Sequence, residues 1–556
     1  MIVECKIDDL LELIGTKMSL SELEETLFLL KAEVEDVKGN QIQIEINPDR
    51  QDMLSAEGIA RVIKSFIGIN TEPHRYAVAA SGKKIIVKRG LARIRRYISC
   101  GIVKGIQSHS ELIKEYMRLQ EALTSTHGRN RRNASIGLYV HDDLEFPVKY
   151  YAEKPEKIEF VPLGNQETMT APEILRKHEK GQEFGYIIEK FKKWPLLVDD
   201  ENKILSLPPI INSNDLGRIT EETENIFVEV TGTHLPTVNQ ALNIMLTSLV
   251  ERGGTIESVE VHYPDGKRVI TPSLEPTKMH LGLGEIHGLI GLDLTTRQVL
   301  ECLRKMGYGG KAIGKGTVEV EIPPYRVDVL HVVDVIEDVA IGYGFDKIQP
   351  TMPETMTRGK LLSTTRLKDK IRDLLIGAGY QEILSYILSS PEILNEKMLR
   401  DRALVRTLNP KSRDYSVLRN SLLPILLDFV SQNQHTDYPQ KIFEIGDIVI
   451  PDKEKETRTK QVPSVAGVII DSEVNLTILM NELGFLLRNL GLEEEFSFTR
   501  STDTAFIDGR YASIEVAGKS VGYFGQIGPL VLKNFNLSKP VIGFEMELAS
   551  KGIWDL

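Results

Sequence analysis

The sequence VEIPPYRVDVLHVVDVIEDVAIGYGFDKI, residues 320–348, contains the pattern that decides the fold of the segment around it. Its first part completes an alternating apolar run, TVEVEIPPYRVDV, which predicts a strand because successive side chains of a strand point to opposite faces. Its second part, HVVDVIEDVAIGYG, has apolar residues at helical spacing and ends in glycine, which predicts a helix. Another predicted helix, LTTRQVLECLRKMGYGG, precedes the strand; it begins at Thr295 or Thr296 and ends at Gly307. Residues 277–345 are therefore expected to form one compact unit.

Four carboxylates gather on this predicted helix and at the end of the strand before it. Asp334, Glu337 and Asp338 lie at positions i, i+3 and i+4, which share one helix face, and Asp328 lies shortly before them. A hard cation with oxygen ligands, such as magnesium, would offset their mutual repulsion. An acidic first turn that complements the helix dipole explains the same pattern without a metal. Spacing alone favours this second interpretation.

The rest of the chain mixes helix and strand patterns and has no internal repeat. Residues 1–70 combine the alternating run QIQIEI with an amphipathic helix, which predicts a small α+β module. Residues 133–262 contain strand patterns such as IFVEV and one long helix, and the proline-containing residues 264–276 predict a domain boundary. The last part begins with a helix at about residues 364–377 and continues through several strands.

Composition places the chain among globular proteins. It has 556 residues, of which 41% are hydrophobic and 26% charged, and this length favours several domains. Lys and Arg number 68 against 79 Asp and Glu, a net charge of −11, so any contact with nucleic acid is expected to be local. Three scattered cysteines, the absence of a basic leader and the absence of an apolar run of about 18 residues predict a reduced, intracellular protein with no membrane partner.

Two local features leave alternatives open. Arginine and lysine are concentrated in KKIIVKRGLARIRRY and HGRNRRNASIGLY, residues 83–97 and 127–139, which are either solvated strand edges or a surface that contacts phosphates. Charge alone favours the solvated edges. Small polar residues near turns in the middle region are either ordinary turn and cap residues or a pocket for water and a small polar substrate; they are Ser206, Asn212, Ser213, Thr231, Thr233 and His234.

Several motifs follow one another along the chain. INPDRQDMLSAEGIARVI lies near the start, and LTSTHGRNRRNASIGLYVHDDL and FVPLGNQETMTAPEILRKHEKG follow. The stretch at residues 320–348 comes next, and VLRNSLLPILLDFVSQNQ, KIFEIGDIV, FIDGRYASIEV and VGYFGQIGP complete the series. In this order, and almost from end to end, the chain resembles the β subunit of phenylalanyl-tRNA synthetase in its archaeal and eukaryotic form.

The resemblance implies an α+β multidomain fold with four parts. Residues 1–82 would form an N-terminal B1-like α+β module and residues 83–264 a B3/B4-like editing region. Residues 270–346 would form a winged-helix-like B5 domain, and residues 355–556 a class II synthetase-like antiparallel sheet with helices (B6/B7). This last part is expected to be catalytically silent, because it has no glycine-rich motif with a terminal arginine and Leu418-Arg419-Asn420 is expected to begin a helix.

The resemblance also implies a phenylalanine–tRNA ligase. Such a chain joins an α subunit in a cytoplasmic (αβ)2 heterotetramer that attaches L-phenylalanine to tRNA(Phe) using ATP. The α subunit binds ATP and phenylalanine and contains the synthetic active site. The family's metal site corresponds to Asp328, Asp334, Glu337 and Asp338, which reverses the preference from spacing and implies Mg²⁺ in a structural role.

The family further implies an editing site that hydrolyses mischarged tyrosyl-tRNA. Its pattern corresponds to Leu197, Ser206, Glu229 and Thr231 in this chain, and Glu229 stands where the pattern has an aspartate. Glu229 and Thr231 would hold the tyrosine moiety and water, while the tRNA itself assists catalysis. This departure keeps open a structural and tRNA-binding subunit whose editing site is inactive. A paralogue with another RNA or protein partner is the remaining alternative.

Overall fold

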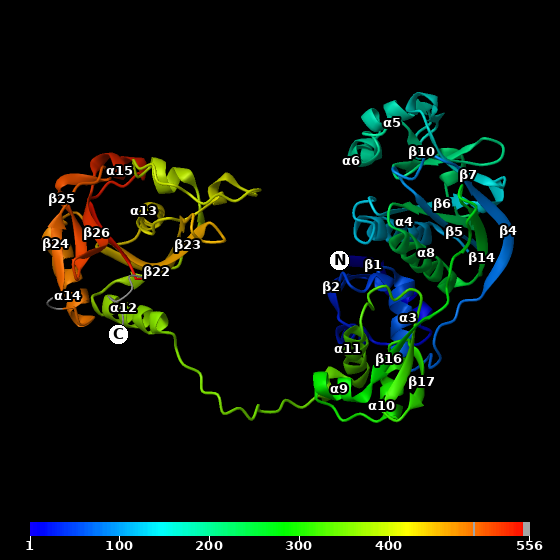
Figure 1. Ribbon diagram of the computed structural model, residues 1–556, viewed down its shortest axis with the longest axis horizontal. Coiled ribbons are helices and arrows are strands. Elements are labelled where there is room, and N and C mark those ends of the chain that lie inside the picture. Colours follow the sequence, from blue (N-terminus) through cyan, green and yellow to red (C-terminus); the bar gives the residue numbers. More distant parts are fainter. Residues whose placement is uncertain (493–494, 549–556) are drawn as a thin grey trace. The chain divides into compact units, whose positions relative to one another are not determined.

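The structure is a computed structural model that describes residues 1–492 and 495–548 (Figure 1). It is an α+β fold divided into two compact units, Met1–Met352 and Pro353–Leu556. The division falls between the expected B5 domain, which ends at residue 346, and the class II-like part expected at residues 355–556. Within that last part, residues 493–494 and 549–556 lie outside the described residues. None of the described helices combines the length and the apolar character that a membrane span needs.

The first unit begins with a small module built on a three-stranded antiparallel sheet, in the order β1-β3-β2. The alternating isoleucines of QIQIEI form β3, where Ile42, Ile44 and Ile46 point to the core and are buried. Helices α1 and α3 pack together beside this sheet. The elements of the module are β1 (Ile2–Lys6), α1 (Ile7–Ile14), α2 (Leu20–Leu29), β2 (Ala32–Lys38), β3 (Gln41–Ile46) and α3 (Ala56–Phe66).

A ten-stranded sheet forms the middle of the first unit, in the order β12-β11-β10-β7-β4-β14-β5-β13-β6, with β15 beside β14. The sheet includes β4, which begins at Val78, and β15, which ends at Thr271, so it extends past both ends of the expected range 83–264. The reason is pairing: β4 is parallel to β14, and β15 returns antiparallel to β14 after a turn at residues 263–267.

Helices α4 and α8 lie on one face of this sheet, and the short helices α5 and α6 lie beyond β10 (Figure 1). The strands are β4 (Val78–Val87), β5 (Tyr97–Lys104), β6 (Ala134–Val140), β7 (Val148–Glu153), β10 (Trp194–Val198), β11 (Ile204–Leu207), β12 (Ile211–Asn212), β13 (Ile226–Gly232), β14 (Thr255–His262) and β15 (Arg268–Thr271). The helices are α4 (Ser110–Ser125), α5 (Ala171–Lys177), α6 (Glu179–Phe184), α7 (Asn214–Gly217) and α8 (Leu235–Leu249), and a two-stranded ladder pairs β8 (Glu159–Phe160) with β9 (Met169–Thr170).

The sheet curls until its two edge strands approach each other. Strands β12 and β6 stand at opposite ends of the strand order, yet the side-chain amide of Asn212 on β12 donates a hydrogen bond to the Leu138 carbonyl oxygen on β6 at 3.2 Å. Tyr139 on β6 also donates to Ser206 on β11, at 2.8 Å. This seam brings together side chains that are far apart in the sequence.

Residues 277–345 form the last part of the first unit. Its three-stranded antiparallel sheet has the order β16-β18-β17, and α10 packs against α11. Helix α10 begins after the capping residue Thr295, as expected, because the Thr295 hydroxyl accepts a hydrogen bond from the Gln298 amide. The elements are β16 (Thr277–Gly282), α9 (Leu283–Ile290), α10 (Thr296–Lys305), β17 (Gly309–Gly314), β18 (Thr317–Ile322) and α11 (Val332–Tyr343).

The second unit is built on a seven-stranded sheet in the order β19-β22-β23-β27-β26-β25-β24, antiparallel except between β19 and β22. Helices α12 and α14 cover one face, and α13 and α15 cover the other. Its helices are α12 (Ser363–Gly377), α13 (Leu423–Gln432), α14 (Leu476–Asn489) and α15 (Pro529–Asn534). Its strands are β19 (Gln381–Glu382), β20 (Leu388–Ser389), β21 (Val417–Leu418), β22 (Gln440–Pro451), β23 (Thr459–Ile470), β24 (Phe496–Arg500), β25 (Phe506–Val516), β26 (Lys519–Ile527) and β27 (Val541–Glu547).

The helix expected to begin at residues 418–420 begins at Leu423 instead. Leu418 pairs with Leu388 in the short β20–β21 ladder, which holds the backbone extended. The Arg419 guanidinium turns inward, where it donates to Glu444 Oε1 at 2.6 Å and to the Ser385 hydroxyl at 2.8 Å. Arg419 is therefore buried in an ion pair.

Candidate functional site

The four residues expected to form the editing site lie on three strands of the ten-stranded sheet. Leu197 on β10 is paired directly with Ser206 on β11, while Glu229 and Thr231 lie two apart on β13 and share one of its faces. All four are buried. The seam between β11 and β6 is what brings Ser206 and Glu229 to one place.

A cavity of about 430 Å³ opens at this seam. Ser206 and Glu229 both line it, together with Asn212 of β12 and Ser135 of β6. The charged residues Glu121, Arg131, Glu179 and Lys180 line it as well, and so does His178. The cavity therefore has polar groups in its wall and several charged side chains beside them.

Glu229 has one buried polar atom of this wall without a partner among the described residues. It is 2% exposed, its Oε1 lies 3.2 Å from the Tyr139 hydroxyl, and its Oε2 has no hydrogen-bond partner within the described part of the chain. Burial raises the pKa of Glu229 to about 8, so at neutral pH the carboxyl group is mostly protonated. A neutral carboxyl group can donate one hydrogen bond and accept others.

Tyr139 connects the polar groups of the wall. Its hydroxyl lies 2.8 Å from Ser206 Oγ, 3.2 Å from Glu229 Oε1 and 3.3 Å from Asn212 Oδ1. A phenol has only one hydrogen to donate, so a protonated Glu229 can complete the network by donating to the Tyr139 oxygen. Tyr139 could not be predicted from the sequence, because β6 carries no local signal that its side chain reaches across the seam.

Gly137, opposite Glu229 on β6, leaves room for this network. A Cβ atom at Gly137 would lie 2.8 Å from Glu229 Oε1 and would also collide with the Tyr139 hydroxyl. The glycine is thus required by close approach of side chains from the neighbouring strand.

Thr231 and Leu197 do not reach the cavity. The Thr231 hydroxyl accepts a hydrogen bond from Arg95 Nε at 2.9 Å and lies 3.3 Å from the Ser135 hydroxyl. Leu197 belongs to the apolar cluster behind the wall. The expectation that Thr231 holds tyrosine or water directly therefore needs correction, because its hydroxyl is occupied by Arg95 and faces the interior.

Arg95 comes from the basic run at residues 83–97, but it is fully buried. It donates to the Ser135 hydroxyl at 2.9 Å and to the Arg131 carbonyl oxygen at 2.9 Å, in addition to Thr231. Burial lowers its pKa to about 10. Arg95 is therefore an internal anchor of the wall, whereas Lys84, Arg89 and Arg96 remain exposed.

The other polar residues of the middle region separate into two groups. Asn212 lines the cavity with Ser206. Ser213 caps α7, Thr233 donates to the Arg132 carbonyl oxygen, and His234 contacts the Thr237 hydroxyl at 2.9 Å. These three positions are turn and cap residues, as the simpler interpretation holds.

The four carboxylates expected to bind magnesium lie in and before α11, but each contacts a protein donor. Asp328 and Asp338 both accept hydrogen bonds from Arg326, with Nη2 at 2.7 Å and 2.5 Å from their Oδ2 atoms. Asp334 Oδ2 accepts from the backbone amides before α11, and Glu337 pairs with Lys31 at 2.9 Å.

In this arrangement protein groups, and not a metal ion, balance the charge of the four carboxylates. Arg326, whose side chain is 2% exposed, supplies the positive charge between Asp328 and Asp338. Residues 1–492 and 495–548 contain no group of three or more His, Cys, Asp or Glu side chains placed to hold a metal ion. The capping role of Asp334 agrees with the interpretation of an acidic helix start.

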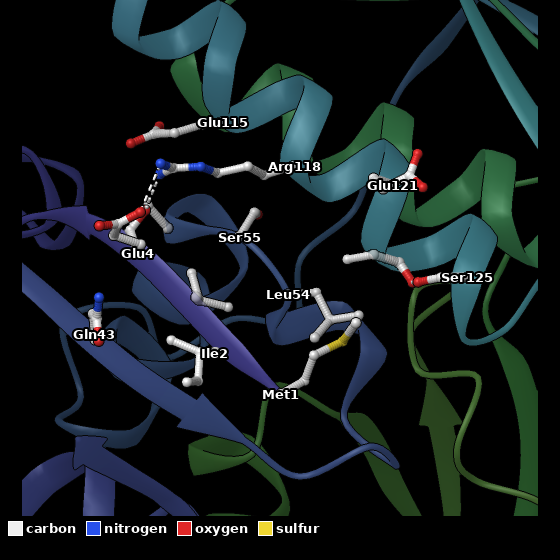
Figure 2. Close-up of a pocket in the computed structure, with 13 residues that line it drawn as sticks. Met1, Ile2, Glu4, Gln43, Leu54, Ser55, Glu115, Arg118, Glu121 and Ser125 are labelled. Atoms are coloured by element: carbon white, nitrogen blue, oxygen red, sulfur yellow. Dashed lines mark hydrogen bonds and ion pairs between the residues drawn. The ribbon is translucent and has the colours of Figure 1, made fainter. Parts of the chain in front are cut away.

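A second cavity, of about 360 Å³, lies between β1 and α4. Figure 2 shows Arg118 of α4 reaching down to Glu4 of β1, and their ion pair measures 2.6 Å. Glu115 and Glu121 of the same helix also line this cavity, and both form ion pairs elsewhere, with Arg252 and Arg131. Because its charged residues are paired, we interpret this cavity as part of a joint between the N-terminal module and α4.

Two family models match the chain. The model described as tRNA synthetase B5 domain matches residues 279–345, and the model described as Phenylalanyl tRNA synthetase beta chain CLM domain matches residues 348–548. Together they cover the unit around α11 and the seven-stranded sheet.

Curated relatives match almost the whole length. The phenylalanine–tRNA ligase beta subunit of Pyrococcus furiosus is 39% identical over 547 residues, which is 97% of this chain and 98% of the relative. That of Methanosarcina acetivorans is 38% identical over 522 residues, 94% of each chain.

A solved structure matches the first unit. It is an N-terminal fragment of the phenylalanyl-tRNA synthetase beta subunit from Pyrococcus horikoshii, 38% identical, with a TM-score of 0.60. The match covers 62% of this chain and 99% of the fragment. Together with the relatives, it leads to one conclusion: the chain belongs to the family of phenylalanine–tRNA ligase beta subunits.

Proposed function

We propose that this chain works in the cytoplasm with an α subunit, as one half of an (αβ)2 phenylalanine–tRNA ligase, and that it hydrolyses mischarged tyrosyl-tRNA in the cavity at Ser206 and Glu229. The observation that carries the editing part is Glu229 Oε2, a buried carboxyl oxygen in the cavity wall without a partner in the described residues. A buried polar atom of this kind costs free energy unless a ligand satisfies it.

The proposal assigns phenylalanine and ATP to the α subunit. A class II active site needs arginines that clamp the phosphates of ATP. Arg419, which stands near the start of α13, is instead held by Glu444 and Ser385 and is buried. This supports a silent sheet that packs against the partner, with tRNA(Phe) bound by the assembled enzyme.

The cavity offers hydrogen-bond partners for the phenolic hydroxyl group, which is the one chemical difference between tyrosine and phenylalanine. An apolar pocket rejects a substrate with an added hydroxyl only about 100-fold, whereas a site built to hydrogen-bond that hydroxyl rejects the analogue without it by about 10⁴ or more. Glu229 Oε2 and the Tyr139 network supply such hydrogen bonds. Phenylalanyl ester would leave them unpaired, so correctly charged tRNA is spared.

Ser206 lines the cavity, where its hydroxyl can form a hydrogen bond with the ester or with a water molecule. Its oxygen accepts from Tyr139 at 2.8 Å, which leaves its own hydrogen free to point into the cavity. The terminal ribose of the tRNA supplies a further hydroxyl beside the ester, in keeping with the assistance expected from tRNA. Arg95 and Thr231 act behind this wall as positioning residues.

Magnesium binding by Asp328, Asp334, Glu337 and Asp338 stays a prediction from the family resemblance. Binding there requires Arg326 and Lys31 to release their carboxylates. Titration of the purified chain with magnesium in a calorimeter tests it. Heat that disappears in Asp338→Asn supports a site, and equal heat in both proteins contradicts it.

The editing proposal is tested with the complex of this chain and the α subunit from the same genome. Preformed tyrosyl-tRNA is added to wild type, Glu229→Ala and Thr231→Ala, and phenylalanine charging is measured in parallel. We expect wild type to hydrolyse the ester, and Glu229→Ala to hydrolyse it about tenfold more slowly or worse while charging is unchanged. Charging without any wild-type hydrolysis would support the alternative, a structural and tRNA-binding subunit with an inactive editing site.

A further inference from the structure

The segment of residues 126–133, THGRNRRN, which we call the arginine loop, adopts a backbone that side chains disfavour. Arg129, Asn130 and Arg131 have φ values of 50°, 50° and 62°, so three successive residues with side chains lie in the left-handed region. Such a run is rare because each Cβ crowds the backbone. It persists only where surrounding contacts fix it, and strain of this kind is concentrated at functional sites.

The contacts that fix the loop come from the wall of the candidate editing cavity. Arg95 donates to the Arg131 carbonyl oxygen at 2.9 Å, and the Thr233 hydroxyl donates to the Arg132 carbonyl oxygen at 3.0 Å. The Arg131 guanidinium donates to the Ile210 carbonyl oxygen at 2.9 Å and lies 4.0 Å from the centre of the Phe184 ring. Arg131 thus connects the loop to α6 and to the cavity. Its guanidinium is occupied by these contacts, so we do not assign it to ligand binding.

The same backbone presents the neighbouring arginines outward. Arg129 and Arg132 are exposed, and neither side chain has an ion-pair partner in the described residues. The Arg132 guanidinium lies 5.2 Å from the centre of the Tyr186 ring, and Tyr186 is 46% exposed. The strained loop therefore places two exposed arginines beside Arg131, which lines the cavity, and one of them lies over the partly exposed ring of Tyr186.

Charge and shape indicate what this surface binds. The chain carries a net charge of −11, so a locally cationic surface beside Arg131, which lines the cavity, is not a general property of the molecule. Arginines follow a phosphate backbone, and a partly exposed tyrosine ring can stack on an unpaired base whatever its sequence. An acidic peptide would use the arginines but has no need of the ring.

We infer that Arg129, Arg132 and Tyr186 form the path by which the single-stranded 3′ end of a tRNA enters the cavity, with Tyr186 stacking on a base and the arginines contacting phosphates. The inference rests on the proposed function, because it requires an ester on the terminal ribose to reach Glu229 in the cavity. It also assigns the exposed arginines of the second basic run to phosphate contact, while Arg95 and Arg131 serve the fold.

The first test uses the complex with the α subunit and tyrosyl-tRNA hydrolysis at several salt concentrations. Tyr186→Ala is expected to lower kcat/KM about tenfold, mostly through KM, while Tyr186→Phe stays within about twofold of wild type. Arg129→Ala and Arg132→Ala are each expected to reduce the slope of log kcat/KM against log salt by about 0.7. Phenylalanine charging should be unchanged in all four.

The matched control is Arg297→Ala. Arg297 is an exposed arginine on α10, at the opposite end of the first unit from α6, and it should behave as wild type (Figure 1). Hydrolysis by Tyr186→Ala at the wild-type rate would overturn the stacking role, even if kcat/KM falls in the arginine variants. A parallel loss of charging in the variants would show a general defect and would also overturn the inference.

A second test does not depend on hydrolysis. A tRNA with 8-azidoadenosine as its 3′ nucleotide is bound to the complex and photo-crosslinked, and the labelled peptide is sequenced. Label in residues 126–133 or around Tyr186 supports the path, and label only elsewhere on this chain or on the α subunit contradicts it. If wild type fails to hydrolyse tyrosyl-tRNA, the proposed function fails, and this crosslink still decides whether the 3′ end binds here.

Discussion

At the scale of single residues, the account depends on the ionisation of Glu229. Glu229 lies on β13 between β5 and β6. Burial, which raises the pKa of its carboxyl group, outweighs Arg95 and the Tyr139 hydrogen bond, which lower it. The longer side chain, in place of the aspartate of the family pattern, still reaches the Tyr139 hydroxyl. A protonated Glu229 is therefore a hydrogen-bond donor in the cavity wall, and this has consequences for pH dependence.

We expect tyrosyl-tRNA hydrolysis by wild type to fall as pH rises through about 8, because the neutral carboxyl group is the active form. The decline should approach about tenfold per pH unit, after subtraction of spontaneous ester hydrolysis. Glu229→Gln keeps the donor and acceptor but does not ionise, so it should retain activity within about threefold at pH 7 and lose the decline. Wild-type activity that rises through pH 8 and is lost in Glu229→Gln would mean that the carboxylate acts as a base.

The hydroxyl of Tyr139 is expected to matter because it joins Ser206 and Glu229. Tyr139→Phe removes this link and leaves polar groups of the wall unpaired, so kcat/KM for tyrosyl-tRNA should fall by about tenfold or more. Tyr116→Phe is the matched control, since Tyr116 is also buried but its hydroxyl has no partner in the described part of the chain. Equal hydrolysis by the two variants would remove Tyr139 from the site.

Sequence patterns could identify only part of this wall. Ser206 and Glu229 follow from the family pattern, and the cavity brings them together. Tyr139 contributes through contacts across the seam, between strands at opposite ends of the sheet order, and Gly137 leaves the space for Tyr139 and Glu229; no local pattern records such contacts. Thr231 shares the face of Glu229, yet a buried arginine from a run that looked like surface charge occupies its hydroxyl.

At the scale of elements, hydrophobic periodicity predicts most of the long helices and strands. Helices α10 and α12 and strands β13 and β18 lie where the patterns place them. The start of α13 could not be predicted, because Leu418 and Arg419 are held extended by long-range contacts to β20 and Glu444. Periodicity reports which face is buried, whereas the partner that buries it is set by the tertiary fold.

The crossing of α10 and α11 depends on one glycine. A Cβ atom at Gly342 of α11 would lie 2.9 Å from the carbonyl carbon of Cys302 on α10, closer than packing allows. We expect Gly342→Ala to reduce the free energy of unfolding by about 1–3 kcal/mol, because the helices must separate. Gly284→Ala on α9, where a Cβ would meet nothing within 4 Å, is the control and should be neutral or slightly stabilising. Urea unfolding measures both, and equal stability of the two variants would contradict the packing account.

At the scale of the whole molecule, the first unit is joined by ion pairs as well as by a shared apolar core. Arg252, next to α8, binds Asp9 and Glu57 of the N-terminal module at 2.7 Å and 2.5 Å, and Glu115 of α4 at 2.9 Å. This joint lies beside the cavity in which Arg118 meets Glu4 (Figure 2). Three carboxylates share the guanidinium of Arg252, so the stability of this joint depends on the ionisation of these carboxylates.

We expect Arg252→Ala to destabilise the chain by about 3 kcal/mol or more, since it leaves buried carboxylates without a partner. Burial, followed by repulsion from Glu57, raises the pKa of Glu115 to about 7. A raised folded-state pKa means that stability from this group is complete at low pH and is lost as pH rises from about 4.5 through 7. The variant should therefore lose more stability at pH 8 than at pH 5. Arg118→Ala, whose pair is half exposed, should cost less than about 1 kcal/mol.

Urea unfolding at the two pH values measures both variants. A cost for Arg252→Ala that is the same at pH 5 and pH 8 would show that Glu115 does not titrate within the joint. The sequence predicts the three carboxylates and the arginine only as isolated charges, because Asp9 and Arg252 are far apart along the chain and no spacing rule links them.

The accumulation of tyrosyl-tRNA by the active enzyme is the direct test of an editing site at this cavity. The complex of this chain with its α subunit is given ATP, tyrosine and tRNA(Phe), and the charged tRNA is followed over time for wild type and Glu229→Ala, with phenylalanine as the parallel substrate. The account predicts that tyrosyl-tRNA accumulates only with Glu229→Ala, while both proteins charge phenylalanine equally. Equal accumulation of tyrosyl-tRNA by wild type and variant would contradict an editing site at this cavity.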